Sequence, residues 1–142
     1  MKTVAQLLAL KPSGIVAVAP GVTVLDAVRL LAEKNVGAVL VMDGPRLVGM
    51  FSERDYARKV DLKGKSSANT PVSEVMTREV VFVTPTHTNE DCMALMTDKR
   101  VRHLPVVAND QVVGLLSIGD LVKDLISEQQ FIISQLESYI HG

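Results

Sequence analysis

The stretch Gly49-Met-Phe-Ser-Glu-Arg-Asp55 has a counterpart 65 positions later, Gly114-Leu-Leu-Ser-Ile-Gly-Asp120. Each consists of a glycine, two apolar residues, a serine, two variable residues and an aspartate. The same shift aligns the chain without a gap from Ile15 to Leu62, and it superimposes identical residues at Pro20/Pro85, Thr23/Thr88, Leu30/Leu95, Val36/Val101, Val41/Val106 and Val48/Val113. Before Ile15 the register slips, with about three extra residues around positions 11–13. The chain is therefore a tandem duplication.

Composition places the chain among ordinary globular proteins. Its 142 residues are 47% hydrophobic, 22% charged and only 4% aromatic, so the core must be aliphatic. The net charge of −1 gives no general attraction to nucleic acid or membranes. One cysteine cannot form an internal disulfide, and the three scattered histidines show no zinc-ligand spacing. The apolar run at positions 4–10 is too short and interrupted for a signal peptide. We expect a cytoplasmic protein with no metal and no nucleic-acid or membrane partner.

Each copy shows the same succession of expected elements. A β-branched strand (Ile15–Val18 or Val80–Val83) precedes a helix capped by Thr23 or Thr88. A buried strand (36–42 or 101–107), a turn and a third strand (47–51 or 112–116) follow, and Ser52 or Ser117 begins a second helix. The expected fold is α/β (α+β): two β-α-β-β-α repeats packed through their sheets with pseudo-twofold symmetry, plus a long C-terminal helix. We predict domains at 1–63 and 72–126, a polar linker at 64–71 and a helical extension at 127–142.

The repeated Ser-x-x-Asp has two interpretations. It is a capping box, in which the hydroxyl accepts an N–H at the third helical position and the acid accepts one from the serine. In that case the preceding glycine only permits a tight strand geometry. Alternatively, the free N–H groups of the helix start suit an anion, and the aspartate accepts from two vicinal hydroxyls such as those of ribose. For one isolated copy capping is the simpler interpretation, and the repetition of the whole unit favours a ligand.

Together with Val101-Arg-His-Leu-Pro-Val106 and Val72-Ser-Glu-Val-Met-Thr77, the two motifs resemble a pair of CBS domains, the arrangement called a Bateman module. The resemblance covers roughly residues 4–126. It implies a regulatory module, not an enzyme, that binds adenosine-containing ligands in clefts between the repeats. AMP, ADP, ATP and NAD-type dinucleotides are expected ahead of S-adenosylmethionine.

The resemblance also implies which residues form the two sites. The motif aspartate holds the ribose hydroxyls, the motif serine assists at ribose or phosphate, and the other copy supplies the adenine wall. One expected site comprises Ser117 and Asp120 with Gly14, Ile15, Val16, Val36, Gly37 and Ala38. The other comprises Ser52 and Asp55 with Val80, Val81, Phe82, Val101, Arg102 and His103.

The two copies differ in charge near the second strand. Lys99, Arg100, Arg102 and His103 form a positive cluster that suits phosphates, whereas the first copy has Asn35, Gly37 and Ala38 in place of Arg100, Arg102 and His103. Lys99 and Arg100 suit a helix C-terminus equally well, whereas Arg102 and His103 lie beyond the helix and are expected at the ligand. The phosphate partners of the first copy, and whether both sites fill, stay open. Cys92 aligns with Ala27 on an apolar stripe and is expected to be buried and inert.

The chain continues beyond the repeat as a long apolar-patterned segment. We call six residues spaced 4-3-4-3-4 the seam: Val122, Ile126, Gln129, Ile133, Leu136 and Ile140. Leu125 and Ile132 widen it. A helix here is about 30 Å long, and it either folds back on its own sheet or pairs with a helix of a second subunit. We favour the second arrangement, a homodimer in which Gln129 fixes the register.

We therefore predict a stand-alone two-CBS protein that senses an adenosyl ligand and passes occupancy to its oligomer or to an unidentified protein effector. The main alternative is an adaptor whose repeats are structural and whose tail oligomerises without a physiological nucleotide. An enzyme acting on adenosine derivatives is a further alternative, but the sequence shows no base–nucleophile pair.

Overall fold

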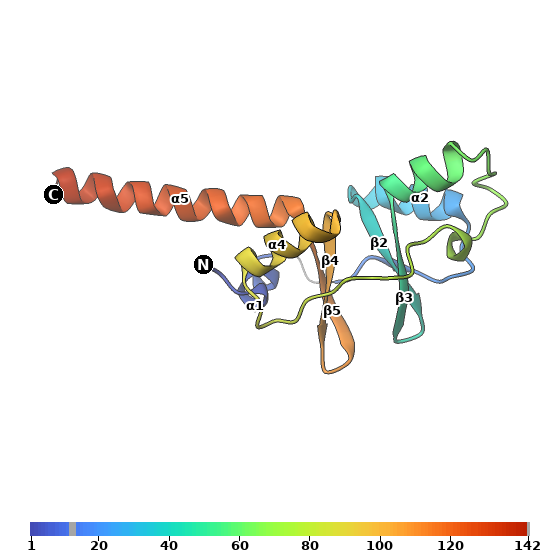
Figure 1. Ribbon diagram of the computed structural model, residues 1–142, viewed down its shortest axis with the longest axis horizontal. Helices are drawn as coiled ribbons and strands as arrows, with labels where there is room; N and C mark the ends of the chain where they lie inside the picture. Colours follow the sequence, from blue (N-terminus) through green and yellow to red (C-terminus); the bar gives the residue numbers. More distant parts are fainter. Residues whose placement is uncertain (12–13, 142) are drawn as a thin grey trace. The chain divides into compact units, whose positions relative to one another are not determined.

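The computed structural model describes residues 1–11 and 14–141, which form two compact units (Figure 1). We call Gly14–Val80 with Asn109–Val112 the repeat-1 unit, and Met1–Ser13, Val81–Ala108 and Val113–Gly142 the repeat-2 unit. The elements in chain order are α1 (Val4–Ala9), β1 (Ala17–Val18), α2 (Val24–Lys34), β2 (Ala38–Asp43), β3 (Arg46–Ser52), α3 (Glu53–Asp55), the π-helix η1 (Tyr56–Asp61), the 3₁₀-helix η2 (Val72–Glu74), α4 (Asn89–Lys99), β4 (His103–Ala108), β5 (Gln111–Ser117) and α5 (Ile118–His141). The architecture is the expected mixture of small sheets and helices with a long C-terminal helix.

The repeat-1 unit is built on a three-stranded sheet in the order β1-β2-β3. β1 runs parallel to β2, and β2 runs antiparallel to β3, with a register shift between Val41 and Met42. Helix α2 begins as predicted, because the Asp26 N–H donates to Thr23 Oγ1 at 3.2 Å. Its expected apolar stripe enters the core, which comprises Val24, Ala27, Leu31, Val39, Val41, Phe51, Val60, Val72, Val75 and Met76.

The repeat-2 unit contains the two-stranded sheet β4-β5 with helices α1, α4 and α5. Its core comprises Val4, Leu7, Val83, Cys92, Met96, Leu104, Val106, Leu116 and Leu121. Cys92 is fully buried, as predicted, and burial raises the pKa of its thiol to about 11.

Each copy's leading segment belongs to the core of the other copy's unit. Helix α1 packs in the repeat-2 unit, where the Val4 N–H donates to the His87 carbonyl at 2.7 Å. Residues 72–76, which align with 4–8, pack instead in the repeat-1 core. The compact units are thus discontinuous in sequence, and the boundaries 1–63, 64–71, 72–126 and 127–142 stay a prediction for the duplicated sequence.

The expected first strands are short. In repeat 1 the strand covers Ala17–Val18, and in repeat 2 the segment 80–83 makes a single parallel bridge, Val83 to Val106. The reason is visible at one aligned pair: the Leu40 N–H donates to the Val16 carbonyl at 3.1 Å, whereas its counterpart Pro105 has no N–H to donate. The ladder therefore loses a hydrogen bond in repeat 2, and a regular strand does not form.

Helix α5 runs for 24 residues from Ile118 to His141 (Figure 1). Its first turns are anchored by Leu121 and Asp124, which are both buried. Residues 129–141 are all exposed, so this part of the helix does not fold back on its own sheet. Within residues 1–11 and 14–141, no helix combines the length and apolar character needed to cross a bilayer.

Candidate functional site

Both motifs form capping boxes. In repeat 1 the Asp55 N–H donates to Ser52 Oγ at 3.2 Å, and the Ser52 N–H donates to Asp55 Oδ2 at 3.0 Å. In repeat 2 the Asp120 N–H donates to Ser117 Oγ at 3.2 Å, and the Ser117 N–H donates to Asp120 Oδ2 at 2.8 Å. The capping interpretation is therefore confirmed for both copies. A capping carboxylate can also bind a ligand only if some of its remaining lone pairs have no donor from the protein.

Another segment approaches both motif glycines closely, and at Gly49 the approaching atoms include a backbone carbonyl oxygen. A Cβ at Gly49 would lie 2.5 Å from the Met76 sulfur and 2.9 Å from the Thr77 carbonyl oxygen. A Cβ at Gly114 would lie 2.6 Å from a methyl group of Leu8, the residue that aligns with Met76. The glycines thus make room for the leading segment that packs across each β-strand, in agreement with a structural role.

Asp55 is saturated with donors. Its Oδ2 accepts from the Ser52 N–H and hydroxyl, and its Oδ1 accepts from Thr77 Oγ1 at 3.1 Å and lies 3.0 Å from Lys59 Nζ. The residue is only 8% exposed. Both carboxylate oxygens are therefore occupied by groups of the same unit.

Asp120 has a different environment. Its Oδ2 accepts from the Ser117 N–H and from Lys11 Nζ at 2.7 Å, and its side chain is 27% exposed. Within the described chain no group donates to its Oδ1. Burial acts to raise the pKa of Asp120, but the Lys11 ammonium and the Ser117 hydrogen bonds outweigh it and hold the pKa below its ordinary value. Asp120 is thus an ionised carboxylate with one open oxygen at neutral pH.

Lys11 is a further candidate residue, which the repeat pattern did not indicate. Its ammonium donates to the Leu115 carbonyl at 2.7 Å as well as to Asp120. In repeat 1 Thr77 makes the two corresponding contacts. Its N–H donates to the carbonyl of Met50, which aligns with Leu115, and its hydroxyl donates to Asp55. The sequence carried one signal for this exchange, because Lys11 lies where the register of the duplication slips.

The strand ends adjoin the motifs of their own units. The Glu53 N–H donates to the Gly37 carbonyl at 3.1 Å, and in the aligned contact the Ile118 N–H donates to the Arg102 carbonyl at 2.9 Å. Ala38 pairs with Ser52 across β2 and β3. The predicted wall residues Gly37 and Arg102 therefore lie beside the motif of their own copy.

The predicted site residues are divided between the two units. The repeat-1 unit holds Gly14, Ile15, Val16, Val36, Gly37, Ala38, Ser52, Asp55 and Val80; the repeat-2 unit holds Val81, Phe82, Val101, Arg102, His103, Ser117 and Asp120. Phe82 is 53% exposed and Arg102 is exposed, so both are accessible to a ligand. Each expected site draws residues from both units, and its assembly stays a prediction. Arg100 is the left-handed C-cap of α4, which agrees with the helix-end interpretation of that residue.

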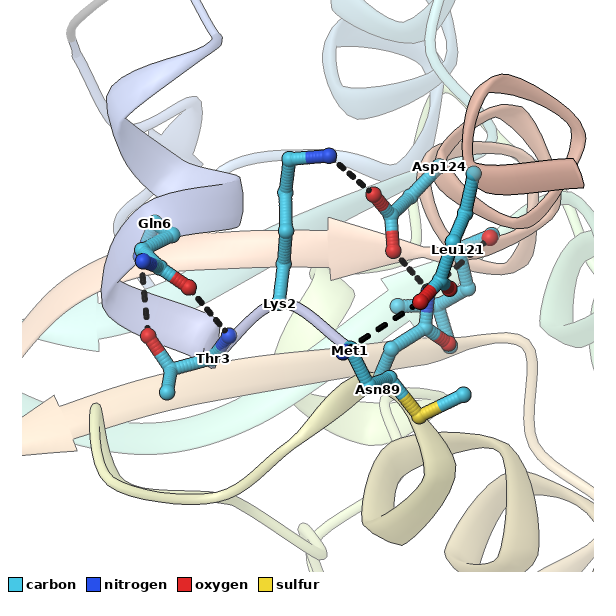
Figure 2. Close-up of polar contacts among 8 residues, drawn as sticks. Met1, Lys2, Thr3, Gln6, Asn89, Leu121 and Asp124 are labelled. Atoms are coloured by element: carbon cyan, nitrogen blue, oxygen red, sulfur yellow. Dashed lines mark hydrogen bonds and ion pairs between the residues drawn. The ribbon is translucent and has the colours of Figure 1, made fainter. Parts of the chain in front are cut away.

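A second polar cluster lies near the chain start (Figure 2). Lys2 Nζ donates to Asp124 Oδ1 at 2.8 Å, and Asn89 Nδ2 donates to Asp124 Oδ2 at 2.7 Å and to the Leu121 carbonyl at 3.0 Å. Burial acts to raise the pKa of Asp124, but Lys2 and Asn89 outweigh it and lower the pKa overall. No sequence pattern indicated this cluster, because Asn89 occupies the position of the core residue Val24.

Comparison with known proteins identifies the class to which this duplicated architecture belongs. The family model for the CBS domain matches residues 12–61 and again 72–127. The chain therefore belongs to the CBS-domain family, as a tandem pair. In the region of similarity it is 40% identical over 125 residues to the mitochondrial CBS domain-containing protein CBSX3 of Arabidopsis thaliana, which covers 84% of this chain and 61% of the plant protein. It is 37% identical over 112 residues to YhcV of Bacillus subtilis, which covers 79% of each chain.

Solved structures agree with this assignment. A signal-transduction protein with CBS domains from Burkholderia ambifaria, as that structure is described, is 50% identical with a TM-score of 0.87, and the match covers 90% of this chain and 96% of that one. A CBS domain pair solved with 5′-methylthioadenosine and S-adenosyl-L-methionine has a TM-score of 0.78 at 20% identity, over 87% of this chain and 99% of that one, and therefore shares the fold.

Proposed function

We propose that this CBS-domain pair is a regulatory module that senses an adenosine-containing ligand, AMP, ADP, ATP or NAD, through Asp120. The observation that carries the proposal is the open Oδ1 of a partly exposed, ionised carboxylate at the start of α5. The CBS pair that binds 5′-methylthioadenosine and S-adenosyl-L-methionine supports the choice of an adenosine group. The proposal assigns no catalytic step to the chain.

The chemistry of the proposed contact follows from the donors already present. A vicinal diol donates one hydroxyl to Asp120 Oδ1, which has no competing donor in the described residues. A hydrogen bond to a charged acceptor contributes about 1.5–3 kcal/mol. The second hydroxyl takes the place of the Lys11 ammonium on Oδ2, and Lys11 turns toward the ligand phosphate on its flexible side chain. Ser117 completes the contact at ribose or phosphate.

The two sites are not equivalent in this proposal. A diol at Asp55 would have to displace Thr77 or Lys59 from an almost fully buried carboxylate. Displacing either donor breaks a hydrogen bond or ion pair to a buried carboxylate, which costs about 1–3 kcal/mol. We therefore assign the tighter site to Asp120, with its adenine wall from residues 14–16 and 36–38 of the other copy.

Occupancy is transmitted by a population shift. A ligand that contacts both copies stabilises the arrangement in which they hold it, and it biases any partner or subunit that recognises that arrangement. A homodimer and a separate protein effector are both compatible recipients of this signal.

Isothermal titration calorimetry of the purified chain tests the proposal. AMP, ATP, NAD and S-adenosylmethionine form the panel, and 2′-deoxy-AMP is the matched control that lacks one hydroxyl. We expect 2′-deoxy-AMP to bind at least about tenfold more weakly than AMP, since one charge-assisted hydrogen bond is lost. Equal affinities would contradict the ribose contact. If no ligand of the panel binds, the adaptor interpretation, which the exposed half of α5 favours, replaces the sensor.

A further inference from the structure

The apolar seam of α5 faces away from the unit that anchors the helix. At about 100° per residue, the six seam residues fall within a stripe about 80° wide. The buried residues Leu121 and Asp124 lie roughly 100° and 160° around the helix from the centre of that stripe. The exposed fractions of the apolar seam residues are Val122 40%, Ile126 50%, Ile133 54%, Leu136 57% and Ile140 73%.

An apolar stripe of this length, interrupted only at Gln129, marks an interaction surface when it lies in water. We propose that a second copy of this chain covers it, by laying its own α5 antiparallel along the seam. This surface does not depend on the proposed ligand, because none of the seam residues belongs to the predicted nucleotide sites.

The seam is complementary to itself in the antiparallel direction. The heptad positions are a for Ile126, Ile133 and Ile140, and d for Val122, Gln129 and Leu136, and antiparallel helices place a opposite d. Val122 then faces the partner's Ile140, and Ile126 faces the partner's Leu136. Gln129 faces the partner's Ile133, and its long side chain extends its amide toward water. A twofold axis repeats every contact.

Charge selects the antiparallel direction. Lys123 and Glu137 are the charged residues that border the seam, both at position e. An antiparallel pair places Lys123 against the partner's Glu137 and repeats that ion pair by symmetry. A parallel pair would instead place Glu137 beside the partner's Ile132 and bring the two Gln129 amides together, with neither ion pair formed and with the helix dipoles aligned.

The anchoring of the helix agrees with the same direction. Residues 118–128 include the buried turns of α5, whereas residues 129–141 are all exposed. Antiparallel pairing lays each exposed half along the anchored half of the partner helix, on the side that its own unit leaves open. Each helix is then supported along its whole length.

Sedimentation equilibrium of the full chain tests the surface. We expect a dimer whose dissociation constant rises about tenfold in Glu137→Lys, because two attractive pairs become two repulsive ones. The double variant Lys123→Glu/Glu137→Lys should return to within about threefold of the original. Ser138→Lys, on the opposite face of the helix, is the control that should leave the constant unchanged. A monomer at all concentrations, or a double variant as weak as the single one, would overturn the proposal.

Cysteine cross-linking tests the direction. In a Cys92→Ala background, which copies the aligned Ala27, V122C and I140C chains with tags of different mass are mixed and oxidised. Cross-links between the two tags support the antiparallel pair. I140C chains that join only to each other establish the parallel pair and overturn the proposed direction, and absence of any cross-link overturns the contact. Circular dichroism verifies that the variants keep α5 helical.

Discussion

Replacing the two motif aspartates one at a time separates ligand binding from capping. Both residues hold the serine N–H of their own motif, so the loss of a capping box is common to Asp55→Ala and Asp120→Ala. What differs is the second carboxylate oxygen: Thr77 and Lys59 occupy Asp55 Oδ1, and no described group donates to Asp120 Oδ1. The two variants are therefore matched controls for each other.

The expected change in affinity follows from the open oxygen. Asp120→Ala removes the hydroxyl contact at Oδ1, and the contact at Oδ2 is discounted because Lys11 must first be displaced. Loss of one charge-assisted hydrogen bond, worth about 1.5–3 kcal/mol, should raise the dissociation constant for AMP about 10- to 150-fold. Asp55→Ala should change the same constant less than about threefold, since its carboxylate is already satisfied within its own unit.

Stability should change in the opposite order. Asp55→Ala leaves the partly buried Thr77 hydroxyl without its acceptor and also removes the cap, so we expect a loss of about 2–3 kcal/mol in the free energy of unfolding. Asp120→Ala should cost about 1 kcal/mol, because its site is more exposed. Calorimetry with AMP gives the affinities, and urea unfolding without ligand gives the stabilities. An Asp120→Ala protein that folds normally and binds AMP unchanged would refute the reasoning, as would a loss of affinity confined to Asp55→Ala.

Three further predictions concern the framework. Gly49→Ala should lower the free energy of unfolding by about 1–3 kcal/mol in a urea titration, because the new Cβ overlaps the Thr77 carbonyl oxygen as well as the side chain of Met76; an unchanged midpoint would contradict the steric role. Asp124→Asn should lower stability at neutral pH by about 1–2 kcal/mol through the weakened contact with Lys2. Because the folded-state pKa of Asp124 is lowered, its contribution is present above the unfolded pKa and disappears as pH falls through the folded pKa, so the two unfolding curves should converge in acid. Cys92, with a pKa of about 11, should resist a thiol reagent at pH 8 until urea unfolds the chain, and rapid labelling of the native protein would show that the thiol is accessible.

The sequence predicted what short-range patterns determine. Thr23 and Thr88 cap helices where expected, the apolar stripes of the helices enter the cores, and both Ser-x-x-Asp motifs begin helices. These features depend on residues within one or two turns of each other, so period and capping chemistry are sufficient to find them. Because the chain is duplicated, each pattern occurs twice, and the second occurrence supports the assignment of the first without any other sequence.

The polar contacts that no sequence pattern predicted depend on tertiary structure. Lys11 reaches Asp120 across 109 positions, and Lys2 reaches Asp124 across 122. No local pattern reports which distant side chain completes a carboxylate. The strand expected at 80–83 could have been predicted to be short from the sequence itself. Pro105 aligns with Leu40, whose N–H bonds the first strand in repeat 1, and proline has no N–H to make that bond.

The donors around each aspartate show how a duplicated framework can support two different tasks. Two backbone hydrogen bonds fix Thr77 against repeat 1: its N–H donates to the Met50 carbonyl at 2.8 Å, and the Met50 N–H donates to the Thr77 carbonyl at 2.9 Å. Its hydroxyl is therefore held at Asp55. Lys11 makes the corresponding contacts in repeat 2 through the end of a flexible side chain that is one-third exposed. An ammonium on a flexible stem can leave a carboxylate and keep its charge nearby, whereas a hydroxyl on a paired backbone segment cannot. Because Lys11 donates to Asp120 where Thr77 donates to Asp55, we expect a ligand to displace the donor at Asp120 and not the donor at Asp55.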